Sequence, residues 1–157
     1  MYLSMDKFTP KQRSYIMSRI RGKNTKPELL VFRELRKKGI HFQKHYKVTG
    51  RPDVAFPRKK VAVFINGEFW HGRRFSKIKD RLPEFWKNKL ERNIKRDRKN
   101  YRSLRKDGWK VISIWDTDLK KDIDKQLDKI MEAINTDTQR QKEKLPHLPS
   151  HASKKEI

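Results

Sequence analysis

The spacing of apolar residues predicts two short helices at the start of the chain. The first, over residues 10–21, has Thr9 as its N-cap and ends at Gly22, and the second begins after Thr25 and ends at Gly39. Thr25 and Glu28 also have the spacing of a capping box. The apolar faces consist of Ile16, Met17 and Ile20 in the first helix and of Leu29, Leu30, Phe32 and Leu35 in the second.

Shorter apolar runs predict strands. Residues 40–48 and 54–56 are expected to be strands, joined by a Gly-Arg-Pro-Asp turn that places Asp53 at the start of the second. Residues 61–65 form a continuous apolar run, which is typical of a central strand covered on both faces. A further apolar strand is expected over residues 109–115.

Two longer amphipathic helices complete the pattern. One spans about residues 84–107 and ends near Gly108, and the other spans residues 118–134. The last segment, residues 136–157, is polar and is expected to be a mobile tail. The apolar face of the final helix consists of Leu119, Ile123, Leu127, Ile130 and Met131.

This order of elements predicts an α/β domain with a mixed sheet that helices flank on both faces. We expect residues 1–24 to form a basic N-terminal arm and residues 25–135 to form the main domain. The arm, the domain and the tail together account for the whole chain.

The charge of the chain indicates a polyanionic partner. Its 42 Lys and Arg residues against 19 Asp and Glu give a formal net charge of +23. Residues 72–110 alone carry 16 basic and 5 acidic side chains, so the charge coats segments that also hold the periodic apolar residues. A fixed basic surface of this kind favours nucleic acid as the partner, although a basic protein without nucleic-acid chemistry has the same composition.

The composition also excludes several classes of protein. No apolar run is long enough to span a bilayer and the N-terminus lacks a signal-peptide pattern, so we expect a cytoplasmic protein without membrane contact. The absence of cysteine excludes disulfides, thiolate nucleophiles and cysteine-ligated zinc.

One carboxylate occupies an inward position of the long helix. Leu90, Ile94, Tyr101 and Leu104 form the inward stripe, and Asp97 fills the remaining position of its 4-3-4-3 spacing. An unpaired buried carboxylate would cost several kcal/mol, so Asp97 needs a His or Arg partner. A purely structural ion pair would satisfy the same need.

Three further residues have two interpretations each. Asp53 is either a metal-binding carboxylate at a strand end or a turn-capping residue beside Pro52. His71 follows the central strand and is either a general base near Asp53 or a solvated surface residue. Glu28 is either another site carboxylate or only the second member of the capping box.

Aromatic residues gather near the same strand end. Phe69 and Trp70 are adjacent to each other and precede His71, and Trp86 begins the basic helix. In a basic setting such side chains can stack on or between bases. The alternative is a hydrophobic lid over the strand ends.

Seven segments together resemble the very short patch repair (Vsr) mismatch endonucleases, over roughly residues 10–120. Each segment is a weak signal alone, but their order and spacing are specific. The segments are Arg13-Ser-Tyr-Ile-Met17-Ser-Arg-Ile, Thr25-Lys-Pro-Glu28, Gly50-Arg-Pro-Asp53, Val63-Phe-Ile-Asn-Gly-Glu-Phe-Trp-His71, Glu84-Phe-Trp86, Asn93-Ile-Lys-Arg-Asp97 and Gly108-Trp-Lys-Val.

The resemblance implies a restriction-endonuclease-like fold of the PD-(D/E)xK type and nicking, with Mg²⁺, of the thymine strand at a T·G mismatch in double-stranded DNA. It places Asp53 at the metal-binding aspartate, with the main-chain carbonyl of Ile65 as a second ligand, and His71 at the catalytic base. Glu28 and Asp97 fall at supporting acidic positions. The DNA-binding positions it implies are Met17, Phe69, Trp70 and Trp86, and the Arg13 and Arg19 side chains of the arm join them.

The chain departs from the family at two places. Positions of the family's structural zinc ligands hold Glu68, Arg73, Phe75 and Thr117, so we expect no structural zinc. We expect packing by Phe75 and an ion pair between Glu68 and an arginine to replace the metal; a remodelled loop with altered recognition is the alternative. Asn66 stands where the family has a second histidine, which leaves that imidazole without a counterpart.

Two other functions remain open from sequence. One is a nicking or restriction-type endonuclease without mismatch preference, and the other is a non-catalytic basic DNA-binding protein. For a single nick a monomer on DNA is sufficient, and repair proteins are candidate partners. The resemblance implies a prokaryotic, nucleoid-associated setting.

Overall fold

Four strands form one mixed sheet in the computed structural model, which describes residues 7–20 and 22–143. The strands are β1 (Gln43–Lys44), β2 (Val54–Phe56), β3 (Val61–Asn66) and β4 (Lys110–Trp115), in that spatial order. The β1–β2 and β2–β3 pairs are antiparallel, and β3 and β4 are parallel. The mixed sheet expected from sequence is therefore confirmed, and β3 is buried along its whole length as its apolar run predicts.

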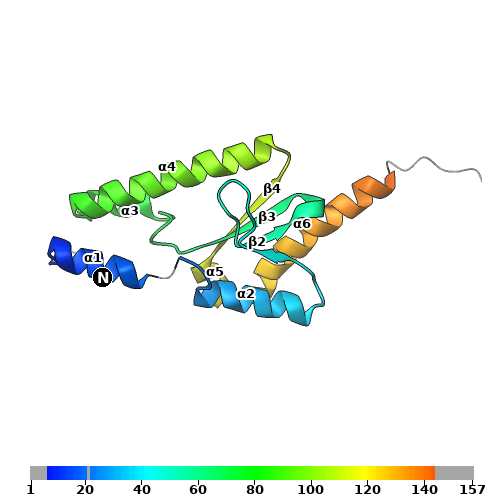
Figure 1. Cartoon of the computed structure of the whole chain (residues 1–157), viewed down its shortest axis with the longest axis horizontal. Coiled ribbons are helices and arrows are strands. Elements are labelled where there is room, and N and C mark those ends of the chain that lie inside the picture. The colour runs from blue at the N-terminus through cyan, green and yellow to red at the C-terminus, as the bar shows by residue number, and fades with distance from the viewer. Residues whose placement is uncertain (1–6, 21, 144–157) are drawn as a thin grey trace, which may run out of the picture.

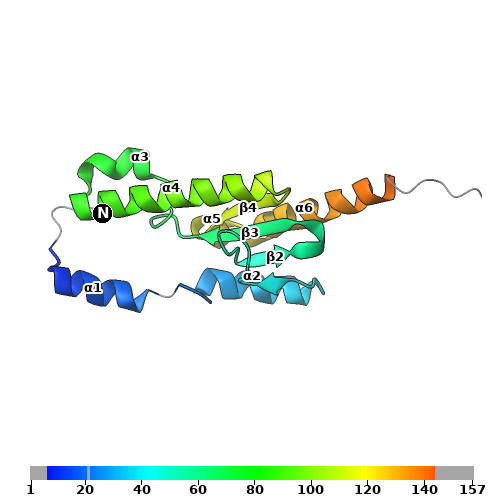
Figure 2. The same ribbon diagram turned by 45° about the horizontal axis from the view of Figure 1, so that its top comes forward.

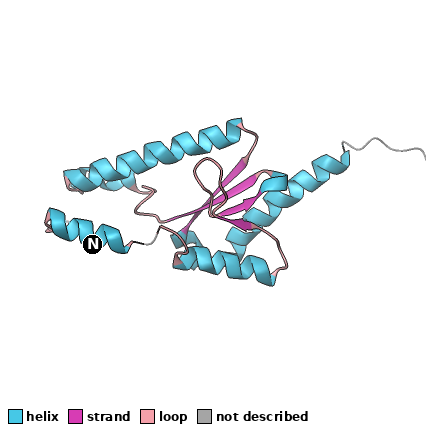
Figure 3. Cartoon of the chain, viewed as in Figure 1, coloured by secondary structure: helices cyan, strands magenta, loops and turns pink. Residues whose placement is uncertain are grey.

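Helices cover the sheet on both faces (Figures 1 and 3). The principal helices are α2 (Lys26–Lys37), α4 (Glu84–Lys106) and α6 (Ile123–Glu143), and shorter ones are α1 (Pro10–Arg19), α3 (Phe75–Ile78) and α5 (Asp116–Lys121). Single turns of 3-10 helix, η1 (Pro57–Lys59) and η2 (Lys79–Arg81), join neighbouring elements. Among the described residues, no helix is long and apolar enough to cross a membrane.

The alternation of side chains along β3 divides the core into two layers. One layer contains Val61, Val63 and Ile65, which pack with buried residues of α2 and α6. The other layer contains Ala62 and Phe64, which pack with Leu104 of α4. Because successive side chains of a strand point to opposite faces, one apolar strand holds helices on both sides. Figure 2 shows α4 on one side of the sheet and α2 on the other.

The first two helices differ from their predicted apolar faces. In α1 none of the residues is buried, and in α2 the buried apolar residues are Val31, Phe32 and Leu35, while Leu29 is 47% exposed. Assigning Leu29 to the inward face was wrong because tertiary packing rotates that face toward Val31. The helix α1 lies outside the layered part of the fold (Figures 1 and 2), so it has no core to pack against.

Three predicted boundaries also change. The strand expected over residues 40–48 is reduced to β1, because His45 adopts a left-handed φ of +48° and leaves the sheet. Asp122 divides the last helix into α5 and α6, and its side chain accepts a hydrogen bond from the Lys125 N–H. The helix α6 continues to Glu143, past the expected start of the tail, and residues 144–157 lie outside the described part of the chain.

Gly72 occupies a position where any side chain would clash. Its φ is +68°, and an added Cβ would lie 2.3 Å from Ile94 Cδ1. We expect Gly72→Ala to lower the free energy of unfolding by about 2–4 kcal/mol, through left-handed strain and overpacking against α4. Urea denaturation measures this loss.

Gly39→Ala is the matched control for that substitution. Gly39 has nearly the same φ, +69°, but nothing lies within 4 Å of an added Cβ. The free energy of unfolding of the control should therefore fall only by the cost of the left-handed strain, roughly 1–2 kcal/mol. If the free energy of unfolding fell equally in the two variants, the Ile94 side chain would be able to move aside without loss of stability.

Candidate active site

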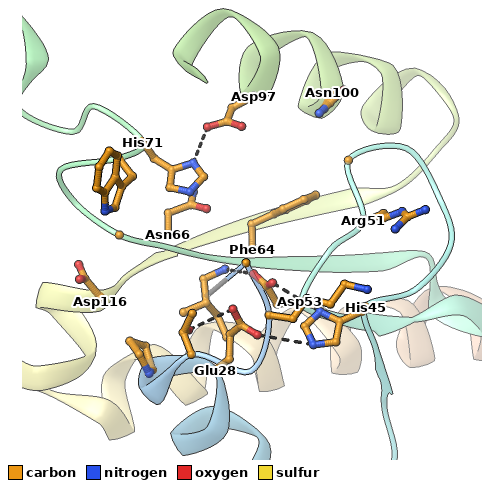
Figure 4. A pocket seen from close by; sticks show the side chains of 18 of the residues that line it. Glu28, His45, Arg51, Asp53, Phe64, Asn66, His71, Asp97, Asn100 and Asp116 are labelled. Atoms are coloured by element: carbon orange, nitrogen blue, oxygen red, sulfur yellow. Dashed lines mark hydrogen bonds and ion pairs between the residues drawn. The ribbon is translucent and has the colours of Figure 1, made fainter. Parts of the chain in front are cut away.

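A pocket of about 850 Å³ opens at the end of β3, between the start of α2 and the middle of α4. Its lining includes all four residues predicted to take part in catalysis, Glu28, Asp53, His71 and Asp97. Figure 4 shows Asp53 and Glu28 on one side of Phe64, with His71 and Asp97 on the other. The topology therefore brings together residues that are up to 69 positions apart in sequence, from Glu28 to Asp97.

Asp53 lies before β2 and faces the neighbouring central strand. Its Oδ2 accepts a hydrogen bond from the Ile65 N–H at 2.7 Å. Burial, with a smaller contribution from the Glu28 carboxylate, raises the pKa of Asp53 to about 7, against the opposing effects of the Ile65 N–H and His71. A cation bound nearby would stabilise the charged form of such a carboxylate, which is partly desolvated and lies beside a second carboxylate.

His71 and Asp97 form a close pair across the pocket. The distance from His71 Nδ1 to Asp97 Oδ2 is 2.5 Å, and the other carboxylate oxygen lies 3.4 Å from an Arg96 nitrogen. Asp97 thus has the partner that its inward position requires, and an arginine nitrogen lies near its other oxygen. When Nδ1–H donates to the carboxylate, the lone pair of the imidazole resides on Nε2, which is the tautomer that a general base uses.

Glu28 does not form the capping box that its spacing predicted. Its Oε2 accepts a hydrogen bond from the main-chain N–H of Asn24 at 2.8 Å, and its Oε1 accepts one from the Thr25 hydroxyl at 3.0 Å. A capping box would instead use the Thr25 N–H and leave the hydroxyl to the helix. Glu28 is only 3% exposed, so these bonds fix a buried carboxylate at the pocket wall.

Sequence reasoning missed His45. One ligand atom from each of Glu28, His45 and Asp53 lies within 4.8 Å of the others. The strand pairing was the signal that could have found it: Lys44 is opposite Val54, so the next residue, His45, lies beside Asp53. Two carboxylates and an imidazole form a donor set that fits a divalent cation.

Asn66 and Asp116 also line the pocket but have structural partners. The Asn66 amide donates to the Tyr101 hydroxyl and to Ser113 Oγ, at 2.8 and 2.9 Å. Asp116 Oδ1 accepts the N–H groups of Glu68 and Thr117. Since parallel β3 and β4 end at the same edge, with Asn66 opposite Trp115, the register alone places Asp116 there.

The aromatic residues form a continuous cluster beside the pocket. Trp70 packs against Phe69 at a centroid distance of 5.0 Å and against Trp86 at 5.8 Å, and Phe85 continues the series. The Arg13 guanidinium of α1 lies 4.5 Å from the centre of the Phe85 ring. We name Phe69, Trp70, Phe85 and Trp86 the aromatic cluster; Phe69 and Phe85 are exposed at 36% and 39%.

The other predicted DNA-binding residues lie on α1. Met17 is one helical turn after Arg13 and is half-buried. Arg19 is exposed, and its guanidinium donates to the Tyr15 hydroxyl at 3.1 Å. Neither side chain lines the pocket at Asp53, so any contact with DNA would be made outside it.

Ion pairs hold the segment in which the family binds zinc. Arg74 Nε lies 2.6 Å from Glu68 Oε1, which is the kind of pair expected in place of the metal. Arg73 bonds to Thr117 Oγ1 at 3.2 Å and to Asp118 at 2.9 Å, and its guanidinium holds the pKa of the Asp118 carboxyl below its usual value. Phe75 is half-buried in the same segment.

Comparison with known proteins identifies the family. A family model described as DNA mismatch endonuclease Vsr matches residues 5–77. The type II nicking enzyme V.NmeDIP of Neisseria meningitidis serogroup C is 37% identical over 134 residues, covering 83% of this chain and 90% of the relative. The type II nicking enzyme V.HpaIIP of Haemophilus parainfluenzae is 38% identical, covering 83% and 96%.

A third relative is more distant in sequence. The DNA mismatch endonuclease Vsr of Escherichia coli (strain K12) is 30% identical over 111 residues, covering 69% of this chain and 71% of the relative. The resemblance inferred from the seven short segments is thereby confirmed. The chain belongs to the Vsr family and is a DNA endonuclease of the nicking type.

Proposed function

We propose that this enzyme hydrolyses one phosphodiester bond of double-stranded DNA with a divalent metal ion held at Asp53. The observation that carries the proposal is the pocket in which Asp53 and the His71–Asp97 pair face one another across the end of β3. The metal would supply Lewis-acid stabilisation of charge on the scissile phosphate. We expect Mg²⁺ in that position and a restriction-endonuclease-like arrangement of the sheet around it.

Each residue would have a separate role in the reaction. Asp53 and the Ile65 main-chain carbonyl would hold the ion, and His71 Nε2 would take a proton as a water oxygen attacks the phosphorus. The bond from phosphorus to the leaving sugar oxygen then breaks. Asp97 would hold the imidazole in the required tautomer, and Glu28 would add negative charge beside the metal.

Basic side chains at the rim of the pocket support an anionic substrate. Lys23, Lys26, Arg51 and Arg96 all line it. These cations lie on three separate segments, so a phosphate backbone entering the pocket would meet positive charge from several sides. One active site is sufficient for one nick, and we propose that the enzyme acts on DNA as a monomer.

The aromatic cluster supports a T·G mismatch as the preferred substrate. A mispaired step costs less to unstack than a matched one, so side chains that wedge between bases favour it without reading a full base code. Phe69, Trp70 and Trp86, with Met17 on α1, are the wedge residues in this proposal. Cutting of the thymine strand in very short patch repair is its most specific form.

Nicking without mismatch preference is the second candidate. The relatives with 37% and 38% identity are named as nicking enzymes, and the protein named as a mismatch endonuclease is more distant at 30%. These names favour the broader activity over mismatch repair. The substitutions at the family's zinc positions also lie next to the aromatic cluster, where a change of recognition would arise.

One experiment tests both candidates. The protein and Mg²⁺ are incubated with labelled duplexes that differ only in carrying T·G or T·A at one position, with Asp53→Ala and His71→Ala as controls. A nick confined to the thymine strand of the mismatch, absent from both variants, supports the repair activity. Equal cutting of both duplexes supports nicking without mismatch preference, and metal-dependent cutting by neither would overturn the proposal.

A further inference from the structure

His45 lies where an imidazole could complete the metal centre. Its Nε2 is 3.6 Å from Glu28 Oε2, and its Nδ1 is 4.0 Å from Asp53 Oδ1. Ligands that share one ion, at metal–ligand distances of about 2.0–2.2 Å, stand roughly 3–4 Å apart. The three side chains therefore need only small movements to bind a common ion.

The fold holds His45 in this position from several sides. Its main-chain N–H donates to the Asp53 carbonyl at 3.2 Å, and its ring packs edge-on against Phe32 at a centroid distance of 6.0 Å. Its left-handed φ of +48° costs a residue other than glycine roughly 1–2 kcal/mol. That conformation takes the residue out of the β1 ladder, and the side chain is only 17% exposed.

The hydrogen bonds of the His45 imidazole leave one of its ring nitrogens available to bind an ion. The only hydrogen bond of the ring among the described residues is the weak one between Nε2 and Asn24 Oδ1, at 3.3 Å. One oxygen of Asp53 is engaged by the Ile65 N–H, whereas Oδ1 is the atom that faces His45. An imidazole and a carboxylate oxygen thus face each other at 4.0 Å, too far apart for a direct hydrogen bond.

We propose that His45 is a ligand of the metal centre and that this mixed nitrogen and oxygen set selects among divalent cations. Imidazole nitrogen favours ions such as Co²⁺, whereas Mg²⁺ prefers oxygen ligands throughout. His45 therefore contributes to the binding of Co²⁺ and contributes little to that of Mg²⁺. The inference rests on the proposed function, because it concerns the same metal-dependent site.

Metal binding without DNA tests the inference independently of nicking. Titration calorimetry of the full chain with Co²⁺ and Mg²⁺ compares the wild type with His45→Gln. Outer-shell partners of metal ligands contribute roughly 10–100-fold to affinity, so loss of a direct ligand should weaken Co²⁺ binding at least 10-fold. Mg²⁺ affinity should change little.

Two control variants show whether a change of metal affinity is specific to His45. His41→Gln changes an exposed histidine of the same segment and should leave both affinities unchanged. Asp53→Asn should abolish the binding of both ions at this site. Low-temperature pulsed EPR of the Co²⁺-loaded wild type should show coupling to an imidazole nitrogen, and His45→Gln should lose it.

The outcomes distinguish this inference from the proposed function. If the wild type binds Co²⁺ through Asp53 but His45→Gln binds it equally and no nitrogen coupling is present, His45 is not a ligand and only the inference fails. If Asp53→Asn leaves metal binding intact, the proposed metal site itself fails. If His45→Gln does not fold, nitrogen coupling that persists in His71→Gln still identifies His45, because these two histidines line the pocket.

Discussion

Asp53→Asn is expected to abolish nicking and to stabilise the metal-free protein above pH 7. Loss of the metal-binding carboxylate removes several kcal/mol of charge stabilisation at the phosphate, which corresponds to a rate lower by at least about 10³-fold. Asparagine keeps the side-chain oxygen that accepts the Ile65 N–H, so the local fold should persist. Single-turnover nicking measures the first effect.

The stability gain follows from the raised pKa of Asp53. Because the folded-state pKa, about 7, lies above the ordinary 3.8, the folded protein binds the proton more tightly than the unfolded chain does. The stability of the metal-free wild type should fall as the pH rises from about 4 to about 7 and stay low above it. Removing the charge should recover on the order of 2–4 kcal/mol at pH 8.

Thermal unfolding of both proteins with and without Mg²⁺ checks this account. Added Mg²⁺ should stabilise the wild type by mass action and leave Asp53→Asn unchanged. Asp107→Asn, at the exposed C-cap of α4, is the matched control and should alter neither stability nor rate appreciably. If Asp53→Asn were fully active, Asp53 would not be a ligand of the metal.

The elements with strong periodicity could be predicted from the sequence. The helix α4 and strand β3 were expected within a residue or two, because a long stripe of apolar residues and a continuous apolar run have few alternative structures. The interruption of that stripe by Asp97 correctly indicated a paired carboxylate. Local patterns were sufficient here because the partner of Asp97, His71, lies just after the end of β3.

Features that depend on backbone conformation or tertiary packing were not predictable in the same way. The left-handed φ of His45 ends β1 and turns its ring toward Asp53, and no local pattern marks a histidine for that conformation. Glu28 matched a capping box, yet its oxygens accept hydrogen bonds from the Asn24 N–H and the Thr25 hydroxyl. His45 reaches the site through a contact between segments, whereas the bonds of Glu28 are local and differ from the capping-box pattern only in which groups donate.

His71→Gln is expected to reduce the nicking rate by about 10²–10⁴-fold, the usual contribution of a general base. Glutamine can still donate a hydrogen bond to Asp97, so the carboxylate keeps a partner and the pocket should remain folded. Asp97→Asn should lower the rate less, since His71 would keep its ring but lose the group that fixes its tautomer. Single-turnover nicking under saturating enzyme measures both.

The double variant tests whether the two residues act as one unit. If Asp97 works only by orienting His71, adding Asp97→Asn to His71→Gln should lower the rate no further, because residues of one catalytic unit are strongly non-additive. His41→Gln changes an exposed histidine and should leave the rate unchanged. Multiplicative losses in the double variant would instead mean that Asp97 acts on the phosphate or the metal by itself. The contacts of Asp97 favour the first result, since one carboxylate oxygen lies 2.5 Å from His71 Nδ1 and the other lies 3.4 Å from an Arg96 nitrogen.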